Sequence, residues 1–228
     1  MPTRIAVIGD RHVGAEPQDA IEPALHHAAS ALGIRAPEVR WFETDGYAPQ
    51  DLGEADGVWA APSSPFRSLD GALAGITWAR ERDVPLLGTC AGFQHGVIEF
   101  ARNVLGVSGA QHAEYDSSSQ ELFIDELLCS LAGQVMTIRL EDEVLRNVYG
   151  EKEALERYYC RFGLNPRYRS ALEDAGLQTA GVDVTDGDVR ILRLHGHAFF
   201  VLTLFVPQVR SHPDAPHPLI TSFLRAAS

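Results

Sequence analysis

The sequence is poor in basic residues and has no long apolar run. Its 19 lysine and arginine residues face 31 aspartate and glutamate residues, a formal net charge of −12, and they form no cluster of the kind that binds nucleic acid or anionic lipid. No apolar stretch approaches the roughly 20 residues needed to cross a bilayer. The N-terminal segment MPTRIAVIGD enters a strand pattern without the basic region, apolar run and cleavage site of a signal peptide. We therefore expect a cytoplasmic protein whose partners include neither nucleic acid nor membrane.

Cysteine is also scarce. Cys90, Cys129 and Cys160 are irregularly spaced, which favours neither a disulfide framework nor a zinc site. We expect reduced thiols, no metal and no cofactor. Cys129, in ELLCSLAG, is predicted to pack within a helix.

The 228 residues suit one large domain, so residues 1–228 are predicted to form a single unit. Buried-strand patterns at 4–8, 39–42, 57–61 and 84–87 alternate with helical patterns at 21–32 and 69–82, which indicates a mostly parallel sheet with helices on both faces. After residue 106 the pattern is mixed: a hairpin over 182–189, an apolar strand over 199–206 and a closing helix over 217–227. The fold class is therefore α/β.

The segment LLGTCAGFQHGVIEFARNVLG, residues 86–106, carries the clearest chemical signal. It reads as a buried strand, a tight turn at Cys90 and a helix. Small residues on both sides of a nucleophile let the chain bend sharply and present the side chain above the sheet. The free N–H groups at the helix start stabilise a thiolate there.

Several segments carry a resemblance to a known family: GTCAGFQHGVIEFARNVLG, HAEYD, ERYYCRFGLNPRY and HPLITSFLRAA. Together they closely resemble the glutaminase domain of CTP synthase, a class I glutamine amidotransferase. The resemblance implies a three-layer α/β/α, flavodoxin-like fold. It also implies attack of an elbow cysteine on the side-chain amide of glutamine, with ammonia passing to a synthetase domain. This chain resembles a stand-alone relative, which leaves open a synthetase partner in trans.

The resemblance assigns roles to particular residues. Cys90 matches the nucleophile, and Gln94, Glu114 and Arg161 match residues that bind the substrate. A carboxylate for an ammonium group and a guanidinium for a carboxylate suit glutamine or a related amino-acid-like ligand.

Two motifs depart from the family pattern. A segment like FHPEF supplies the catalytic His and Glu in the family, whereas this chain has Val206 and Gln208 at those positions. A Gly-rich oxyanion loop is replaced by one containing Ser63 and Ser64, which puts the backbone donors in doubt. Because valine cannot take a proton from a thiol, ordinary glutamine hydrolysis is expected to be weak or absent.

Other groups could replace the missing base. Cys160 precedes Arg161, so it either packs in the core or faces Cys90 as a second working thiol. Among the histidines, His95 and His112 are the better candidates. Six others are expected on solvated surfaces or too far along the final strand: His26, His27, His195, His197, His212 and His217. The run Glu141-Asp142-Glu143 is expected to be a solvated face.

Two functions remain open from the sequence. One is an amidotransferase-like enzyme that performs thiol chemistry on an amino-acid-like substrate. The other is a non-catalytic sensor or regulatory subunit that binds a metabolite. The oligomeric state is also left open.

Overall fold

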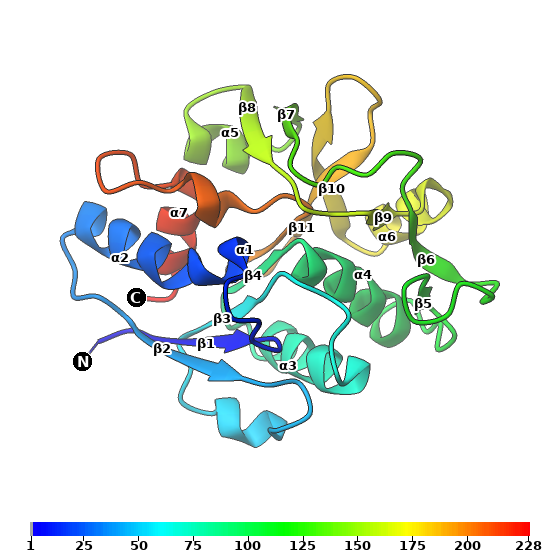
Figure 1. The fold of residues 1–228 in the computed structure, drawn as a ribbon, viewed down its shortest axis with the longest axis horizontal. Coiled ribbons are helices and arrows are strands. Elements are labelled where there is room, and N and C mark those ends of the chain that lie inside the picture. The colour runs from blue at the N-terminus through cyan, green and yellow to red at the C-terminus, as the bar shows by residue number, and fades with distance from the viewer. Residues whose placement is uncertain (1) are drawn as a thin grey trace.

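A nine-stranded mixed sheet runs through the computed structural model, which describes residues 2–228 (Figure 1). Its strand order is β2-β1-β3-β4-β12-β11-β10-β7-β8. The first five strands pair in parallel: β1 (Arg4–Ile8), β2 (Glu38–Phe42), β3 (Gly57–Ala60), β4 (Leu86–Thr89) and β12 (Phe200–Thr203). The carboxyl ends of parallel strands share one edge of a sheet, and this is where ligands bind in such folds.

The other half of the sheet is antiparallel. From β12 it continues through β11 (Val189–Leu194), β10 (Leu177–Asp183), β7 (Val135–Leu140) and β8 (Glu153–Arg157). A separate three-stranded sheet joins β5 (Gln111–His112), β6 (Leu122–Glu126) and β9 (Phe162–Leu164). The hairpin expected around Asp186-Gly187 is present between β10 and β11.

Helices cover both faces of the large sheet. The longer ones are α2 (Ile21–Leu32), α3 (Leu69–Glu81), α4 (Ala91–Asn103) and α7 (Pro218–Ala226). Shorter helices are α1 (Glu16–Asp19), α5 (Glu143–Tyr149) and α6 (Arg169–Asp174), with 3₁₀ turns at Pro49–Leu52, Pro166–Tyr168 and Pro207–Arg210. Because α3 packs on α4 and α2 packs on α7, the sheet lies between two helical layers. The expected three-layer α/β/α fold is confirmed.

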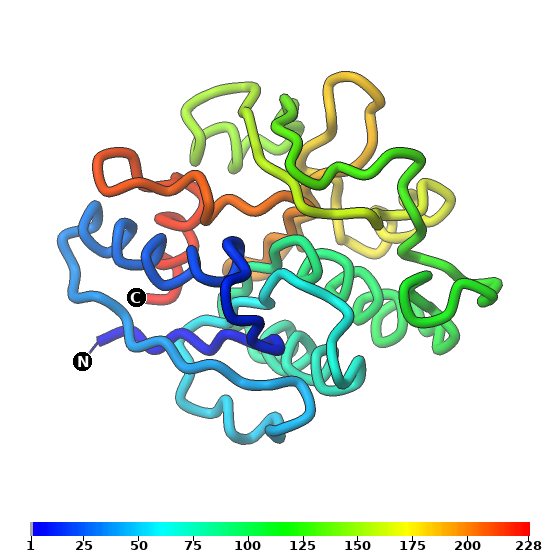
Figure 2. Tube along the Cα trace, viewed as in Figure 1, coloured from blue at the N-terminus to red at the C-terminus, as the bar shows by residue number. Residues whose placement is uncertain are grey.

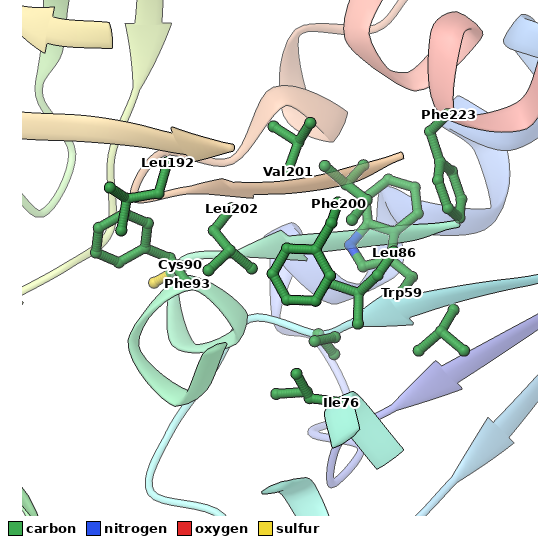
Figure 3. Close-up of a cluster of buried hydrophobic side chains, with 14 of the residues drawn as sticks. Trp59, Ile76, Leu86, Cys90, Phe93, Leu192, Phe200, Val201, Leu202 and Phe223 are labelled. Atoms are coloured by element: carbon green, nitrogen blue, oxygen red, sulfur yellow. The ribbon is translucent and has the colours of Figure 1, made fainter. Parts of the chain in front are cut away.

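The main core fills the space between these layers. Trp59, Phe200 and Phe223 are almost completely buried, and Figure 3 shows Ile76 of α3 and Phe223 of α7 on either side of the central strands. Cys90 lies at the margin of this cluster, so the thiol stands where the apolar core meets the strand ends. The two chain termini also meet, as Figure 2 shows, since the hydroxyl oxygens of Thr3 and Ser228 lie 3.1 Å apart.

Two expectations from the sequence are wrong. Cys129 is exposed in the loop after β6 rather than packed in a helix, because the backbone there stays paired with the neighbouring segment through the Leu127 N–H and the Arg161 carbonyl. Asp142 is not part of a solvated face. Its carboxylate caps α5 by accepting from Leu145 N–H, and it forms an ion pair with Arg193 at 2.9 Å.

No helix within residues 2–228 combines the length and the apolar character that crossing a membrane requires.

Candidate active site

Cys90 sits at the bend between β4 and α4. Its backbone has φ 53° and ψ −104°, a conformation that L-residues rarely adopt and that marks functional turns. Glycines on either side make the bend fit: a Cβ on Gly92 would lie 2.1 Å from the Ala60 carbonyl oxygen. The Cys90 N–H donates to the Thr203 carbonyl at 2.8 Å. The turn is therefore fixed against both neighbouring strands, as the sequence predicted for an elbow.

Cys160 reaches the same point from the segment between β8 and β9. Its Sγ lies 2.8 Å from Cys90 Sγ, and its S–H donates to the Leu204 carbonyl at 2.9 Å. Since the Cys160 proton is directed at Leu204, the Cys90 S–H donates to Cys160 Sγ. Burial, and then the hydrogen bond and charge of Cys90, raise the pKa of the Cys160 thiol well above its ordinary value. Cys160 is thus a protonated thiol at neutral pH.

A cavity of about 630 Å³ opens onto the two thiols. All seven residues that the sequence singled out line it: Ser63, Ser64, Cys90, Gln94, Glu114, Cys160 and Arg161. They come from four separate parts of the chain, so the tertiary fold brings them together.

The charged groups of the cavity have opposite signs. Glu114 Oε2 is buried and has no hydrogen-bond partner among residues 2–228. Arg161 lies on the same cavity and is exposed. A buried, unpaired carboxylate oxygen is costly unless a ligand or water satisfies it. The cavity therefore offers an acceptor for a cationic group and a guanidinium for an anionic one.

Gln94 is held rather than free. Its Nε2 donates to the Phe162 carbonyl at 2.9 Å, and its Oε1 accepts from His112 Nε2 at 3.1 Å. These bonds join α4 to Phe162, the neighbour of Arg161, so Gln94 is fixed as part of the cavity wall.

His95 and His112 do not act as free bases. His95 Nδ1 lies 2.7 Å from the Ala91 carbonyl and therefore carries the proton, leaving Nε2 to accept from the Tyr115 hydroxyl at 2.9 Å. His112 Nδ1 accepts from Glu114 N–H, which directs its Nε2 proton to Gln94. Burial lowers the pKa of His95 to about 4 and that of His112 to about 3. Every ring nitrogen of the pair is engaged, and both rings are neutral at pH 7.

The segment with Ser63 keeps a shape that glycine would favour. Ser63 has φ 81°, in the left-handed region. Buried Gln18 holds the loop by donating to the carbonyls of Asp10 and Pro62 at 2.9 and 3.0 Å. The loop conformation thus survives without a glycine.

Glu16 and Tyr159 are polar cavity residues that the sequence analysis missed. Glu16, in α1, accepts a hydrogen bond from the Tyr159 hydroxyl and lies 3.6 Å from the Arg157 guanidinium. Both Glu16 and Tyr159 line the cavity. In the sequence, only the position of Tyr159 next to Cys160 could have indicated that this pair lies at the cavity.

Val206 and Gln208 follow β12, at the end of the strand nearest the thiols. Val206 is fully buried and donates its N–H to the Arg157 carbonyl at 2.9 Å. Gln208 is also buried, and its Nε2 donates to the Pro17 carbonyl at 2.8 Å. Val206 therefore packs in the core, while Gln208 is held by its bond to Pro17 and keeps an Oε1 that has no hydrogen-bond partner among residues 2–228.

Comparison with known proteins decides the family. Residues 17–226 match the model of the family glutamine amidotransferase class-I. The chain belongs to that family. It is 31% identical to the CTP synthase of Saccharolobus solfataricus over 98% of this chain and 44% of that protein. It is 35% identical to the CTP synthase of Methanospirillum hungatei over 90% of this chain and 40% of that protein.

This amidotransferase chain therefore spans less than half the length of the curated relatives it matches. Its structure superposes with a TM-score of 0.90 on the glutaminase domain of Trypanosoma brucei CTPS with bound acivicin, at 23% identity over 99% of this chain and 93% of that one. That likeness shows a shared fold. The family resemblance seen in the sequence is confirmed.

Two other groups of polar residues lie outside the Cys90 cavity. His217, expected on a solvated surface, is instead buried, and its Nε2 lies 2.9 Å from Glu156 Oε1; helix α7 starts at this residue and draws it against β8. Asp10, Glu43 and Asp45 are close enough to share a cation. However, the guanidinium of Arg67 pairs with both Glu43 and Asp45, and the Asp10 carboxylate already accepts from the Thr44 hydroxyl and from Arg67 N–H. These carboxylates therefore already have partners within the protein.

Proposed function

We propose that the Cys90 cavity binds glutamine or a similar small amino acid and hydrolyses glutamine weakly or not at all. One observation carries this proposal. The cavity holds a carboxylate and a guanidinium that suit the ammonium and carboxylate groups of an amino acid, but among residues 2–228 no free base lies beside the Cys90 thiol. The elbow, the cavity and the family membership favour binding of such an amino acid. The groups around the Cys90 thiol, in contrast, oppose hydrolysis of glutamine.

Ligand binding is supported by Glu114 and Arg161. The buried, unpaired Oε2 of Glu114 is suited to an ammonium group, since charge-assisted hydrogen bonds are the stronger ones. Arg161 offers a planar donor pair for a carboxylate. The T. brucei domain of the same fold binds acivicin, which makes that compound a useful probe beside glutamine.

Hydrolysis is opposed by the groups around Cys90. Its thiol neighbour, Cys160, stays protonated because burial raises its pKa, and it cannot accept a proton. His95 and His112 are neutral, but their nitrogens are all used. Val206 and Gln208 offer neither an imidazole nor a carboxylate. The loss of a general acid–base group lowers a rate by about 10²–10⁴.

Calorimetry and an ammonia assay on the reduced chain test both halves of the proposal. We expect glutamine to bind, ammonia release to be near background, and Glu114→Gln to abolish binding while Asp214→Asn, a control at a carboxylate that is 94% exposed, leaves it unchanged. Turnover comparable to that of intact family members, abolished by Cys90→Ala, would refute the weak-hydrolysis half. Absence of binding by glutamine, glutamate and acivicin would refute the pocket.

The orphan oxygen of Glu114 also favours a second role, that of a sensor or regulatory subunit. A sensor would be stabilised by its ligand through mass action without consuming it. Binding that survives Cys90→Ser, with no product detected by mass spectrometry, supports the sensor. Product formation that depends on Cys90 supports thiol chemistry on an amino-acid-like substrate. To test for a synthetase partner in trans, a synthetase would be added to the ammonia assay, and a partner would change the rate of ammonia release.

A further inference from the structure

Two consecutive carbonyls of one strand end hold the two buried cysteines together. Thr203 accepts from Cys90 N–H at 2.8 Å, and Leu204 accepts from Cys160 S–H at 2.9 Å. The backbone around Cys160 is fixed as well, because its carbonyl accepts from Leu131 N–H at 3.0 Å. The sulfur atoms are 2.8 Å apart, and a disulfide bond of about 2.05 Å would shorten that distance by only about 0.8 Å.

The cavity gives the two thiols different access. Cys90 is 8% exposed and Cys160 2% exposed, and both line the cavity. A small reagent that enters therefore meets Cys90 first. Cys160 is shielded from reagents in solution by its burial and its bond to Leu204, but its Sγ lies 2.8 Å from Cys90 Sγ and so is placed to attack an oxidised Cys90.

We propose that Cys90 and Cys160 form a reversible redox pair that reacts with small hydroperoxides. Cys90 sulfur attacks the terminal peroxide oxygen, the O–O bond breaks, and the Cys90 proton leaves with the departing alkoxide or hydroxide as alcohol or water. Cys90 is then a sulfenic acid. Cys160 sulfur attacks it, the S–O bond breaks, and the departing hydroxyl takes the Cys160 proton as water.

Two thiols lose one electron pair between them, and one hydroperoxide is reduced to an alcohol, or to water when hydrogen peroxide is used, with water as the second product. A small external thiol such as glutathione returns the pair to its reduced form by thiol–disulfide exchange. This activity needs no amino-acid ligand, so it is separate from the proposed glutamine pocket. In the oxidised form the Cys90 thiol is consumed, and the cavity loses its nucleophile.

Mass spectrometry of the full chain tests the pair. The protein is reduced, freed of reductant, treated with one equivalent of hydrogen peroxide, alkylated and digested without reduction. We expect loss of two of the three free thiols, a Cys90–Cys160 cross-linked peptide, and full alkylation of Cys129. Adding glutathione should restore all three thiols. Independent alkylation of Cys90 and Cys160 after oxidation would overturn the proposal.

Single variants separate the two roles. Cys160→Ser should leave Cys90 as a sulfenic acid that dimedone traps, whereas the wild type should accumulate little trapped product. Cys90→Ser should leave Cys160 unoxidised on the same timescale. Cys129→Ser is the matched control and should behave like the wild type. Equal dimedone labelling of Cys90 in wild type and Cys160→Ser would refute a resolving role for Cys160. Thermal unfolding of each reduced variant checks its fold, and the wild-type peptide map decides the pairing without any variant.

Discussion

His112 donates from Nε2 to Gln94 Oε1 at 3.1 Å, which ties the helix after the elbow to the turn that carries Glu114. The same ring accepts from Glu114 N–H through Nδ1. A protonated imidazole would have to donate from both nitrogens, so this arrangement requires the neutral ring. The position of Glu114 in the cavity therefore depends on the protonation state of a buried histidine.

The stability of the protein should decrease on acidification below pH 6.5. Burial lowers the pKa of His95 to about 4 and that of His112 to about 3 in the folded state, from 6.5. Between these values the unfolded chain binds more protons than the folded one, so the free energy of unfolding falls as the pH falls, by up to about 1.4 kcal/mol per pH unit for each histidine. Urea unfolding at pH 7 and pH 5 measures this.

Carboxylates contribute to the same trend, so variants isolate the histidine part. His112→Asn should reduce the difference between pH 7 and pH 5, while His212→Asn, at a side chain that is 68% exposed, should leave it unchanged. Identical differences in wild type and His112→Asn would contradict the prediction.

Alkylation of the reduced protein should rank the three cysteines. Iodoacetamide is expected to modify exposed Cys129 fastest, Cys90 more slowly through the cavity, and Cys160 not at all before unfolding, because burial raises its pKa. Saturating glutamine should slow the modification of Cys90 and leave Cys129 unaffected. Peptide mapping over time gives the three rates; a Cys160 rate equal to that of Cys129 would show that the thiol pair is open to solvent.

Arg80→Ala should destabilise the protein by about 3 kcal/mol or more. The guanidinium donates to both carboxylate oxygens of Glu99, whose side chain is fully buried, at 2.8–3.0 Å, and its removal leaves that charge without a counter-ion. Glu81→Ala, a control at a largely exposed carboxylate that also lies near Arg80, should cost less than about 1 kcal/mol. Urea midpoints of the two variants test the contrast, and equal losses would contradict it.

Gly92→Ala should destabilise the fold strongly and displace Cys90. The added methyl group would lie 2.1 Å from the Ala60 carbonyl oxygen, so either α4 or β3 must move. Gly46→Ala is the matched control, because its methyl group would meet nothing closer than 3.6 Å. Thermal unfolding and the Cys90–Cys160 cross-link together provide the readout. A Gly92→Ala protein with wild-type stability would refute the close approach.

Restoring the missing acid–base pair should raise ammonia release. The double variant Val206→His, Gln208→Glu returns an imidazole and a carboxylate to the segment after β12, and we expect a gain of about 10²-fold over wild type. Val206→Asn, Gln208→Glu is polar without a base and serves as the control. If the two double variants are equally inactive while remaining folded, the barrier lies elsewhere, for example in the Ser63-Ser64 loop.

The local elements of the chain were largely predictable. Strand β1, helix α2 with its left-handed Gly33 end, and the turn at Cys90 follow from apolar periodicity and glycine placement, which act over a few residues. After residue 106 the apolar patterns are weaker, and they did not predict β5 to β9, α5 or α6. These short, partly exposed elements depend on pairing with distant strands, which outweighs their own propensity.

For the site, the sequence determined which side chains are available: a thiol at an elbow, Glu114 and Arg161 in segments similar to a known family, and valine and glutamine where a base and its partner are expected. Only the tertiary structure decided how they meet. Cys160 lies 70 residues from Cys90 in the chain, and the two residues meet because Thr203, the last residue of β12, and Leu204, which follows it, offer adjacent carbonyls to them. The burial that neutralises His95 and His112 and keeps Cys160 protonated is likewise a property of the packed fold, since desolvation depends on every element that surrounds a group and not on its place in the sequence.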